Sequence, residues 1–234
     1  VGGIAANRKL FGQGVDADHL PHTQPPNGSF FRGLPPAEGR GAYPGAALAD
    51  ELLNLIALHD ASNIAAVIVE PMSGSAGVVV PPQGYLQRLR DICTAHHILL
   101  IFDEVITGFG RMGTNFAADF YGVVPDMLNF AKCVTNGVIP LGGVICREHI
   151  YESMMGAHSK APEHAIEFFH GYTYSGHPVA CAAAIATLDL FREEDLFKRA
   201  GEMGPVLGDA MHAALKGLPN VIGIRSLGLA AAVE

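Results

Sequence analysis

The sequence predicts an α/β fold in which helices cover both faces of a mainly parallel sheet. Short unbroken apolar runs, which are typical of strands buried on both faces, alternate along the chain with stretches whose apolar residues recur at helical spacing. The stretches between these runs are long enough for the helical crossovers that join parallel strands. Parallel strands bring their carboxyl ends to one edge of the sheet, which is where open α/β sheets bind ligands.

The first half of the chain predicts a strand-helix-strand unit that follows an extended opening. Residues 12–45 are rich in glycine and proline, so we expect an extended connection over the active-site entrance or a subunit contact. Apolar residues at helical spacing predict a helix over residues 46–59, and an apolar run predicts a strand over residues 64–69. A second helix, over residues 84–97, leads to a strand over residues 98–103.

The second half of the chain predicts two more strands and then two long helices. The strands are expected over residues 127–131 and 142–146. Pro178 opens a helix that we expect to end near residue 191, because proline is tolerated in the first helical turn, and another helix follows over residues 194–216. The expected domains are a large domain over residues 1–220 and the start of a small domain over residues 221–234.

The composition favours a cytoplasmic protein that acts on small molecules. The net charge is −8 and no run of Lys and Arg gathers anywhere, which argues against a nucleic-acid surface. The four cysteines lack CxxC and disulfide-framework spacing, as expected in a reducing compartment. No signal peptide or membrane-length apolar run is visible. The eleven histidines lack the spacing of zinc ligands, so no metal is expected.

Two of the expected strands end in residues with complementary chemistry. One apolar run ends in Asp103 and Glu104, and another ends in Lys132. A lysine that loses hydration at the end of a buried strand is held neutral and can form a Schiff base with an aldehyde cofactor such as pyridoxal phosphate. A carboxylate beside the pyridine nitrogen of that cofactor keeps the nitrogen protonated, so the ring can withdraw electrons. Asp103 and Lys132 fit these two roles.

Several short segments around this pair extend the pattern over nearly the whole chain. They are EP (70–71), IFDEV (101–105), GFGR (108–111), AK (131–132), NG (136–137), PLGG (140–143) and HGYTYSGHP (170–178). Together they resemble the cofactor signature of class III pyridoxal-phosphate-dependent aminotransferases. Within that family they are most similar to the branch that uses ω-amino acids such as β-alanine with pyruvate.

The resemblance implies a fold type I enzyme that moves an amino group from an ω-amino acid or amine to pyruvate. It implies that Lys132 is the catalytic residue and binds pyridoxal phosphate, and that Asp103 holds the pyridine nitrogen. It also implies that Val105 forms an apolar wall under the ring, that Glu70 lies near the cofactor edge, and that Thr173 reaches the cofactor phosphate of the neighbouring subunit. A homodimer with shared sites follows, with a tetramer as a further possibility.

Each of the last three residues also has an ordinary structural explanation. Val105 could be a core residue, Glu70 could cap the following turn, and the Thr173 hydroxyl could bond its own backbone. The family's upstream glycine-serine segment, its Tyr-His-Gly turn and its downstream substrate-binding arginine do not occur in this sequence. Because the chain also begins with Val1 rather than Met, we expect a piece of a longer protein with an incomplete large domain.

Two other functions remain open at the level of sequence. An aminomutase or a decarboxylase would use the same acid and lysine on the same cofactor, and dependence of turnover on a keto acid would distinguish them. The pair Asp103-Glu104 after an apolar run also has the form of a Walker B segment in a P-loop ATPase. That hypothesis is weaker because the chain has no Gly-Lys pair of the kind that a P-loop requires, and because it leaves Lys132 unexplained.

Overall fold

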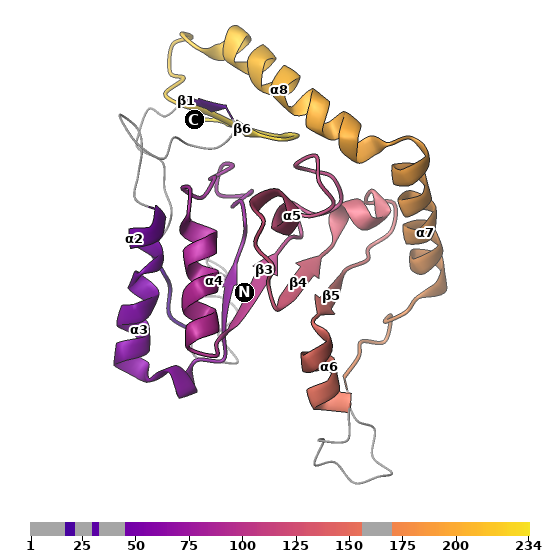
Figure 1. Cartoon of the computed structure of the whole chain (residues 1–234). Coiled ribbons are helices and arrows are strands. Elements are labelled where there is room, and N and C mark those ends of the chain that lie inside the picture. The colour runs from indigo at the N-terminus through magenta and orange to yellow at the C-terminus, as the bar shows by residue number, and fades with distance from the viewer. Residues whose placement is uncertain (1–16, 22–29, 33–44, 156–169) are drawn as a thin grey trace.

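The computed structural model describes residues 17–21, 30–32, 45–155 and 170–234, and within them two sheets (Figure 1). The larger sheet has four strands in the order β2-β3-β4-β5. These strands are β2 (Ala66–Val69), β3 (Leu99–Asp103), β4 (Met127–Phe130) and β5 (Gly143–Cys146). The first three are parallel to one another and β5 is antiparallel to β4. The α/β class with a mainly parallel sheet is therefore confirmed.

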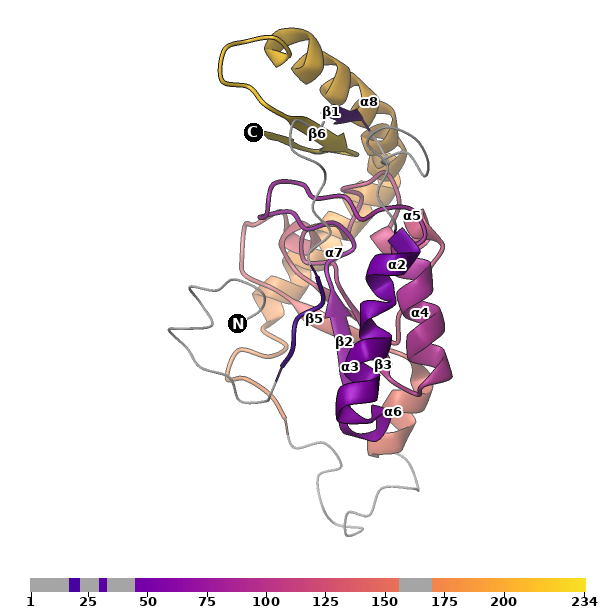
Figure 2. The ribbon, with the colours of Figure 1, turned by 90° about the vertical axis from the view of Figure 1, so that its left-hand side faces the viewer.

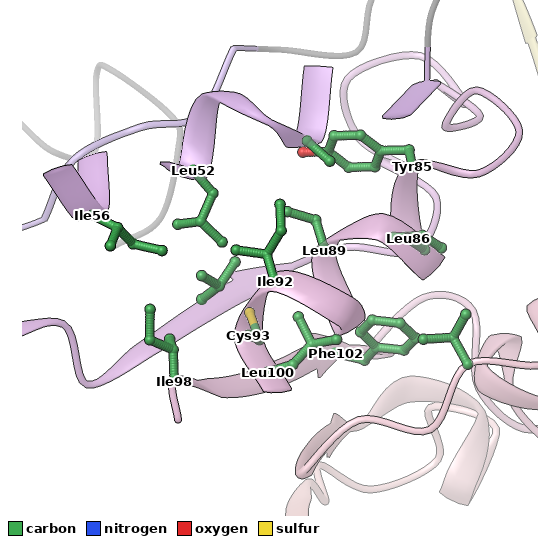
Figure 3. Packing of buried hydrophobic residues seen from close by; sticks show 13 residues of the cluster. Leu52, Ile56, Tyr85, Leu86, Leu89, Ile92, Cys93, Ile98, Leu100 and Phe102 are labelled. Carbon is green, nitrogen blue, oxygen red and sulfur yellow. The ribbon is translucent and has the colours of Figure 1, made fainter. Parts of the chain in front are cut away.

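The main core lies between this sheet and the helices α2 (Gly45–Ala49), α3 (Glu51–His59) and α4 (Tyr85–Ala95). Alternate residues of β3, Leu100 and Phe102, are fully buried in it and meet apolar side chains of α3 and α4 (Figure 3). Full burial of a Leu or Phe side chain stabilises the fold by about 1.5–3 kcal/mol each. The crossover through α4 makes β2 and β3 parallel neighbours, as the sequence predicts.

A second, three-stranded sheet has the order β1-β6-β7 and consists of β1 (Phe30–Arg32), β6 (Ile224–Leu227) and β7 (Ala230–Val233). Helix α8 (Leu196–Leu215) contacts this sheet and follows α7 (Pro178–Glu193). Figures 1 and 2 show the small sheet and α8 together at one end of the molecule, beyond the larger sheet. Both long helices are confirmed within a few residues.

Some elements differ from the expectation. The helix expected over residues 46–59 is two helices, α2 and α3, which meet at Asp50. The extended connection expected over residues 12–45 contains β1, whose strand pairs with β6, and most of the rest lies outside the described residues. Two helices were not predicted, α5 (Ala117–Tyr121) and α6 (Glu148–Met155). None of the described helices is both long and apolar enough to cross a membrane.

Candidate active site

Three of the predicted site residues lie where neighbouring parallel strands end. Glu70 directly follows β2, Asp103 is the last residue of β3, and Lys132 lies two residues after β4. In the register of the sheet Val69 is opposite Phe102, and Asp103 is opposite Asn129. The parallel order thus places the two acids and the lysine along the same edge of the sheet, as predicted.

Asp103 is half-buried at the end of β3. Its Oδ1 accepts one hydrogen bond from the backbone N–H of Val105 at 3.1 Å. Val105 is also half-buried and lies in the turn that follows. The bond fixes the carboxylate against its own loop and leaves Oδ2 for other partners at the sheet edge.

Glu104, the neighbour of Asp103, has a different role. It is fully buried, and its Oε1 accepts from Ala118 N at 2.8 Å while its Oε2 accepts from Ala117 N at 2.6 Å and from the Thr107 hydroxyl at 2.9 Å. Burial raises the pKa of Glu104, although these three hydrogen bonds oppose the rise. The carboxylate caps the first turn of α5. It cannot also polarise a water molecule, which counts against the Walker B hypothesis.

Lys132 begins a short 3₁₀ turn, Lys132–Thr135, directly after the strand. Its backbone is in the left-handed region, with φ at 51°, and Asn136 ends the turn with the same φ. The buried Thr135 closes the segment by donating its hydroxyl to Ile139 O at 2.7 Å. The side chain of Lys132 is exposed, so the described residues do not supply the desolvation that the sequence analysis expected.

The other two predicted residues lie in different surroundings. Glu70 is half-buried, and its Oε2 accepts from Gly74 N at 3.2 Å, which is a turn-capping contact. Thr173 is exposed in the turn before α7, where Ser175 N donates to Tyr172 O at 2.9 Å. Helix α7 contacts the turn that holds Lys132. The structure therefore brings Glu70 to the sheet edge, and it places Thr173 in the turn before α7, the helix that contacts the turn of Lys132.

Arg111, from the GFGR segment, contacts the lysine segment in a way that the sequence analysis did not identify. Its Nη2 donates to the Sγ of Cys133, the residue after Lys132, at 3.2 Å. Its carbonyl accepts from Leu229 N at 2.8 Å, so it also joins the turn between β6 and β7. The GFGR motif drew attention to this segment, but only the fold shows that the Arg111 guanidinium contacts the residue after Lys132.

A charged cluster lies at the opposite edge of the sheet. Asp126 precedes β4, pairs with Arg90 at 2.7 Å and with Arg147 at 3.7 Å, and accepts from Leu100 N at 2.8 Å. Burial would raise the pKa of Asp126, but the hydrogen bond from Leu100 N and the nearby Arg90 outweigh it and hold the pKa below its usual range. This cluster ties α4 and β5 to the amino ends of the strands and has a structural role.

Comparisons with a family model and with curated relatives point to the same protein family. The model of the family described as aminotransferase class III matches residues 32–234. A β-alanine–pyruvate aminotransferase of Pseudomonas aeruginosa is 57% identical over 234 residues, and an ω-amino acid–pyruvate aminotransferase of Pseudomonas putida is 57% identical over 235 residues. Each alignment covers 100% of this chain and 50% of the relative, so the chain spans about half the length of these relatives.

Solved structures agree with the fold. An (S)-enantioselective ω-transaminase from Thermomicrobium roseum superposes with a TM-score of 0.74 at 44% identity, over 81% of this chain and 40% of that chain. A taurine:2-oxoglutarate aminotransferase from Bifidobacterium kashiwanohense, in complex with PLP and glutamate, gives 0.73 at 34% identity, over 81% and 40% of the two chains.

Proposed function

The chain belongs to the class III aminotransferases, and from this we propose that the whole protein moves an amino group from an ω-amino acid or amine to pyruvate. The observation that carries the proposal is the sheet edge on which Asp103 and Lys132 follow neighbouring parallel strands. An acid and an amine at that edge are the pair that this chemistry requires. The relatives with 57% identity indicate the donor class, typified by β-alanine, and pyruvate as the acceptor.

The residues present fit pyridoxal phosphate as the cofactor. Lys132 is exposed, so its Nζ is accessible to an aldehyde carbon, and Asp103 has one carboxylate oxygen beyond the bond to Val105 N. When bound, the cofactor supplies an electron sink for the substrate carbon. Lys132 would hold it through Nζ, and Asp103 would hold the proton on its ring nitrogen. The half-buried Val105 would lie under the ring.

Each residue of the chain then has a defined task in the reaction. Lys132 Nζ would take the proton from the donor carbon and later give it back, which is general acid–base catalysis. The carboxylate of Asp103 would stabilise the proton on the ring nitrogen. Glu70, at the neighbouring strand end, positions groups at the cofactor edge. Thr173 donates its hydroxyl to the cofactor phosphate of the partner subunit.

The proposed assembly is a homodimer with shared sites, and a tetramer of two such dimers is compatible with it. The cytoplasm is the proposed location, since the free cysteines described include the exposed Cys146. We further propose a large domain over residues 1–220 and the start of a small domain from residue 221. The turn between β6 and β7 meets Arg111, so the two parts are connected near the site.

Covalent capture of the cofactor tests the function. The complete protein, loaded with pyridoxal phosphate and reduced with borohydride, should carry the label on the peptide that contains Lys132. Lys198 and Lys216, on and just after helix α8, serve as internal controls and should stay unlabelled. A label on another lysine, or no label at all, would show that the assignment is wrong. Turnover should also require both a donor amine and a keto acid, which an aminomutase or decarboxylase would not.

A further inference from the structure

The backbone at Lys132 needs support from outside its own turn. A non-glycine residue in the left-handed region is strained, and Lys132 follows Ala131, which is fully extended. The bond from Val134 N to Ala131 O is long at 3.4 Å and the bond from Asn136 N to Cys133 O is 3.2 Å, at the upper end of the usual range, so the first half of the turn is weakly closed. A hydrogen bond from another segment reaches this turn at the side chain of Cys133.

Arg111 provides that bond and is itself held at several atoms. Its carbonyl accepts from Leu229 N at 2.8 Å and its Nη1 donates to Leu229 O at 3.4 Å, while Nη2 reaches Cys133 Sγ at 3.2 Å. Gly228 packs closely against this loop. A Cβ at that position would collide with the Arg111 carbonyl and lie 2.7 Å from Met112 Cα. The guanidinium thus spans from the β6–β7 turn to the residue after Lys132.

The hydrogen bonds of Arg111 are better suited to positioning the lysine turn than to stabilising the fold. The Nε of Arg111 is buried without a hydrogen-bond partner among the described residues, and a thiol sulfur is a weak acceptor. An apolar side chain of similar length could fill the same space without leaving a buried donor unpaired. What an apolar side chain could not do is bond to Cys133 and to Leu229 at once.

We propose that Arg111 is a positioning residue for Lys132, which holds the lysine turn through Cys133 Sγ and couples it to the turn between β6 and β7. The part of this inference that concerns catalysis rests on the proposed function of Lys132. The mechanical part, that Arg111 orders the turn, does not depend on any cofactor. The two parts are therefore tested separately.

The mechanical part is tested on the complete protein without cofactor. In Cys133→Ala the amides of residues 131–138 should exchange hydrogen roughly two- to tenfold faster, as expected for the loss of one modest hydrogen bond. Cys133→Ser keeps an acceptor and should restore the slow exchange. Arg111→Met should match Cys133→Ala, and the double variant should be no faster than Arg111→Met alone. Cys146→Ala and the exposed Arg192→Met are the matched controls and should change nothing at residues 131–138.

Unchanged exchange in both Cys133→Ala and Arg111→Met would overturn the proposal, as would a Cys133→Ser variant that behaves like Cys133→Ala. If Arg111→Met does not fold, the Cys133 pair alone decides the outcome. The catalytic part predicts that kcat falls by roughly two- to tenfold in Cys133→Ala with an unchanged KM for the donor, and recovers in Cys133→Ser. Borohydride labelling of a lysine other than Lys132 would contradict the proposed function while leaving the exchange result valid.

Discussion

At the scale of single residues, the adjacent acids Asp103 and Glu104 show how strand geometry divides chemical roles. Successive side chains of an extended segment point to opposite sides, so one acid faces inward and the other faces the sheet edge. Glu104 is fully buried and accepts three hydrogen bonds, whereas Asp103 is half-buried and accepts one from Val105 N. Sequence alone indicated the pair, but only the fold assigned the structural role to Glu104.

Asp103→Asn tests the role of the outward-facing acid. We expect it to retain most cofactor binding in the complete protein and to lower kcat by several orders of magnitude, because a neutral amide cannot hold the ring proton. Steady-state kinetics measures the change. A loss of less than about tenfold corresponds to only about 1.4 kcal/mol of barrier and would contradict the role. Asp91→Asn, an exposed position on α4, is the matched control.

The thiol of Cys93 is expected to be inert in the folded protein. Burial raises the pKa of Cys93 to about 11; nearby Arg90 lowers it slightly and Asp126 raises it slightly. At pH 8 its thiolate population is then on the order of a hundredfold below that of a free cysteine with a pKa of about 8.5. Alkylation followed by mass spectrometry should modify Cys93 only after unfolding in urea. Labelling of Cys93 at the rate of a free thiol in the native protein would contradict this prediction.

At the scale of elements, α5 depends on an acid that comes thirteen residues before it in the chain. Glu104→Ala would leave the N–H groups of Ala117 and Ala118 without their partner, and each buried unsatisfied donor costs about 1–3 kcal/mol. We therefore expect a loss of about 2–4 kcal/mol in the free energy of unfolding, measured in urea, and a smaller loss for Glu104→Gln. Equal effects of the two changes would show that the cap does not depend on the acceptor.

The Asp126 cluster predicts how acid affects the fold. The pKa of Asp126 in the folded protein lies below the unfolded value of about 3.9. The stabilisation of the fold by its carboxylate is therefore complete above that pH and is lost as the pH falls through the folded pKa. Asp126→Asn should lower stability near neutral pH and reduce the steepness of acid unfolding below about pH 4. Urea midpoints measured across that range provide the test. Asp91→Asn should leave the acid profile unchanged, and an unchanged profile in Asp126→Asn would contradict the prediction.

The elements differ in how far the sequence could predict them. Strands β2, β3 and β4 were predictable because each is an apolar run that ends in a polar or charged residue, and α7 because Pro178 marks its start. Strand β1 was not, because it has three residues and pairs with β6, far along the chain. Helix α5 was missed because it has only five residues and part of its first turn is capped by Glu104, thirteen residues earlier in the chain. Local patterns carry no information about such long-range partners.

The exposure of Lys132 shows the same limit within the site. Its position after β4 followed from the sequence, because the apolar run ends there. The left-handed turn at Lys132 is bonded at Cys133 by Arg111, which comes from a distant part of the chain. The sequence could therefore place the lysine along the chain but could not predict its surroundings.

At the scale of the whole molecule, the described chain leaves apolar side chains of the larger sheet uncovered. Ile68 on β2 is 60% exposed and Val144 on β5 is 57% exposed, although neighbouring Val67 is buried. Isolated exposed apolar residues are ordinary, but these belong to strands that carry or flank the candidate site. The chain spans about half the length of these relatives. If the proposed shared site forms, a second subunit is one partner that could cover these side chains.

Sharing of the site between two subunits can be tested by mixing variants of the complete protein. If Thr173 serves the partner's cofactor, a heterodimer of Lys132→Ala and Thr173→Ala has one site with both defects and one intact site. Loss of a single hydroxyl should weaken cofactor retention by about 1–3 kcal/mol, so the assay must use limiting pyridoxal phosphate, at which the Thr173→Ala homodimer is poorly active. Activity should then rise after the two proteins are dissociated and reassociated together.

The control for this experiment is a mixture of Lys132→Ala with Asp103→Asn. Both residues are proposed to serve the site of their own subunit, so every site in that heterodimer keeps one defect and mixing should restore nothing. Recovery with Thr173→Ala but not with Asp103→Asn therefore distinguishes a shared site from a general effect of reassembly. If neither mixture exceeds the activity of its separate components, Thr173 acts within its own subunit, and the shared site must be abandoned while the roles of Lys132 and Asp103 stand.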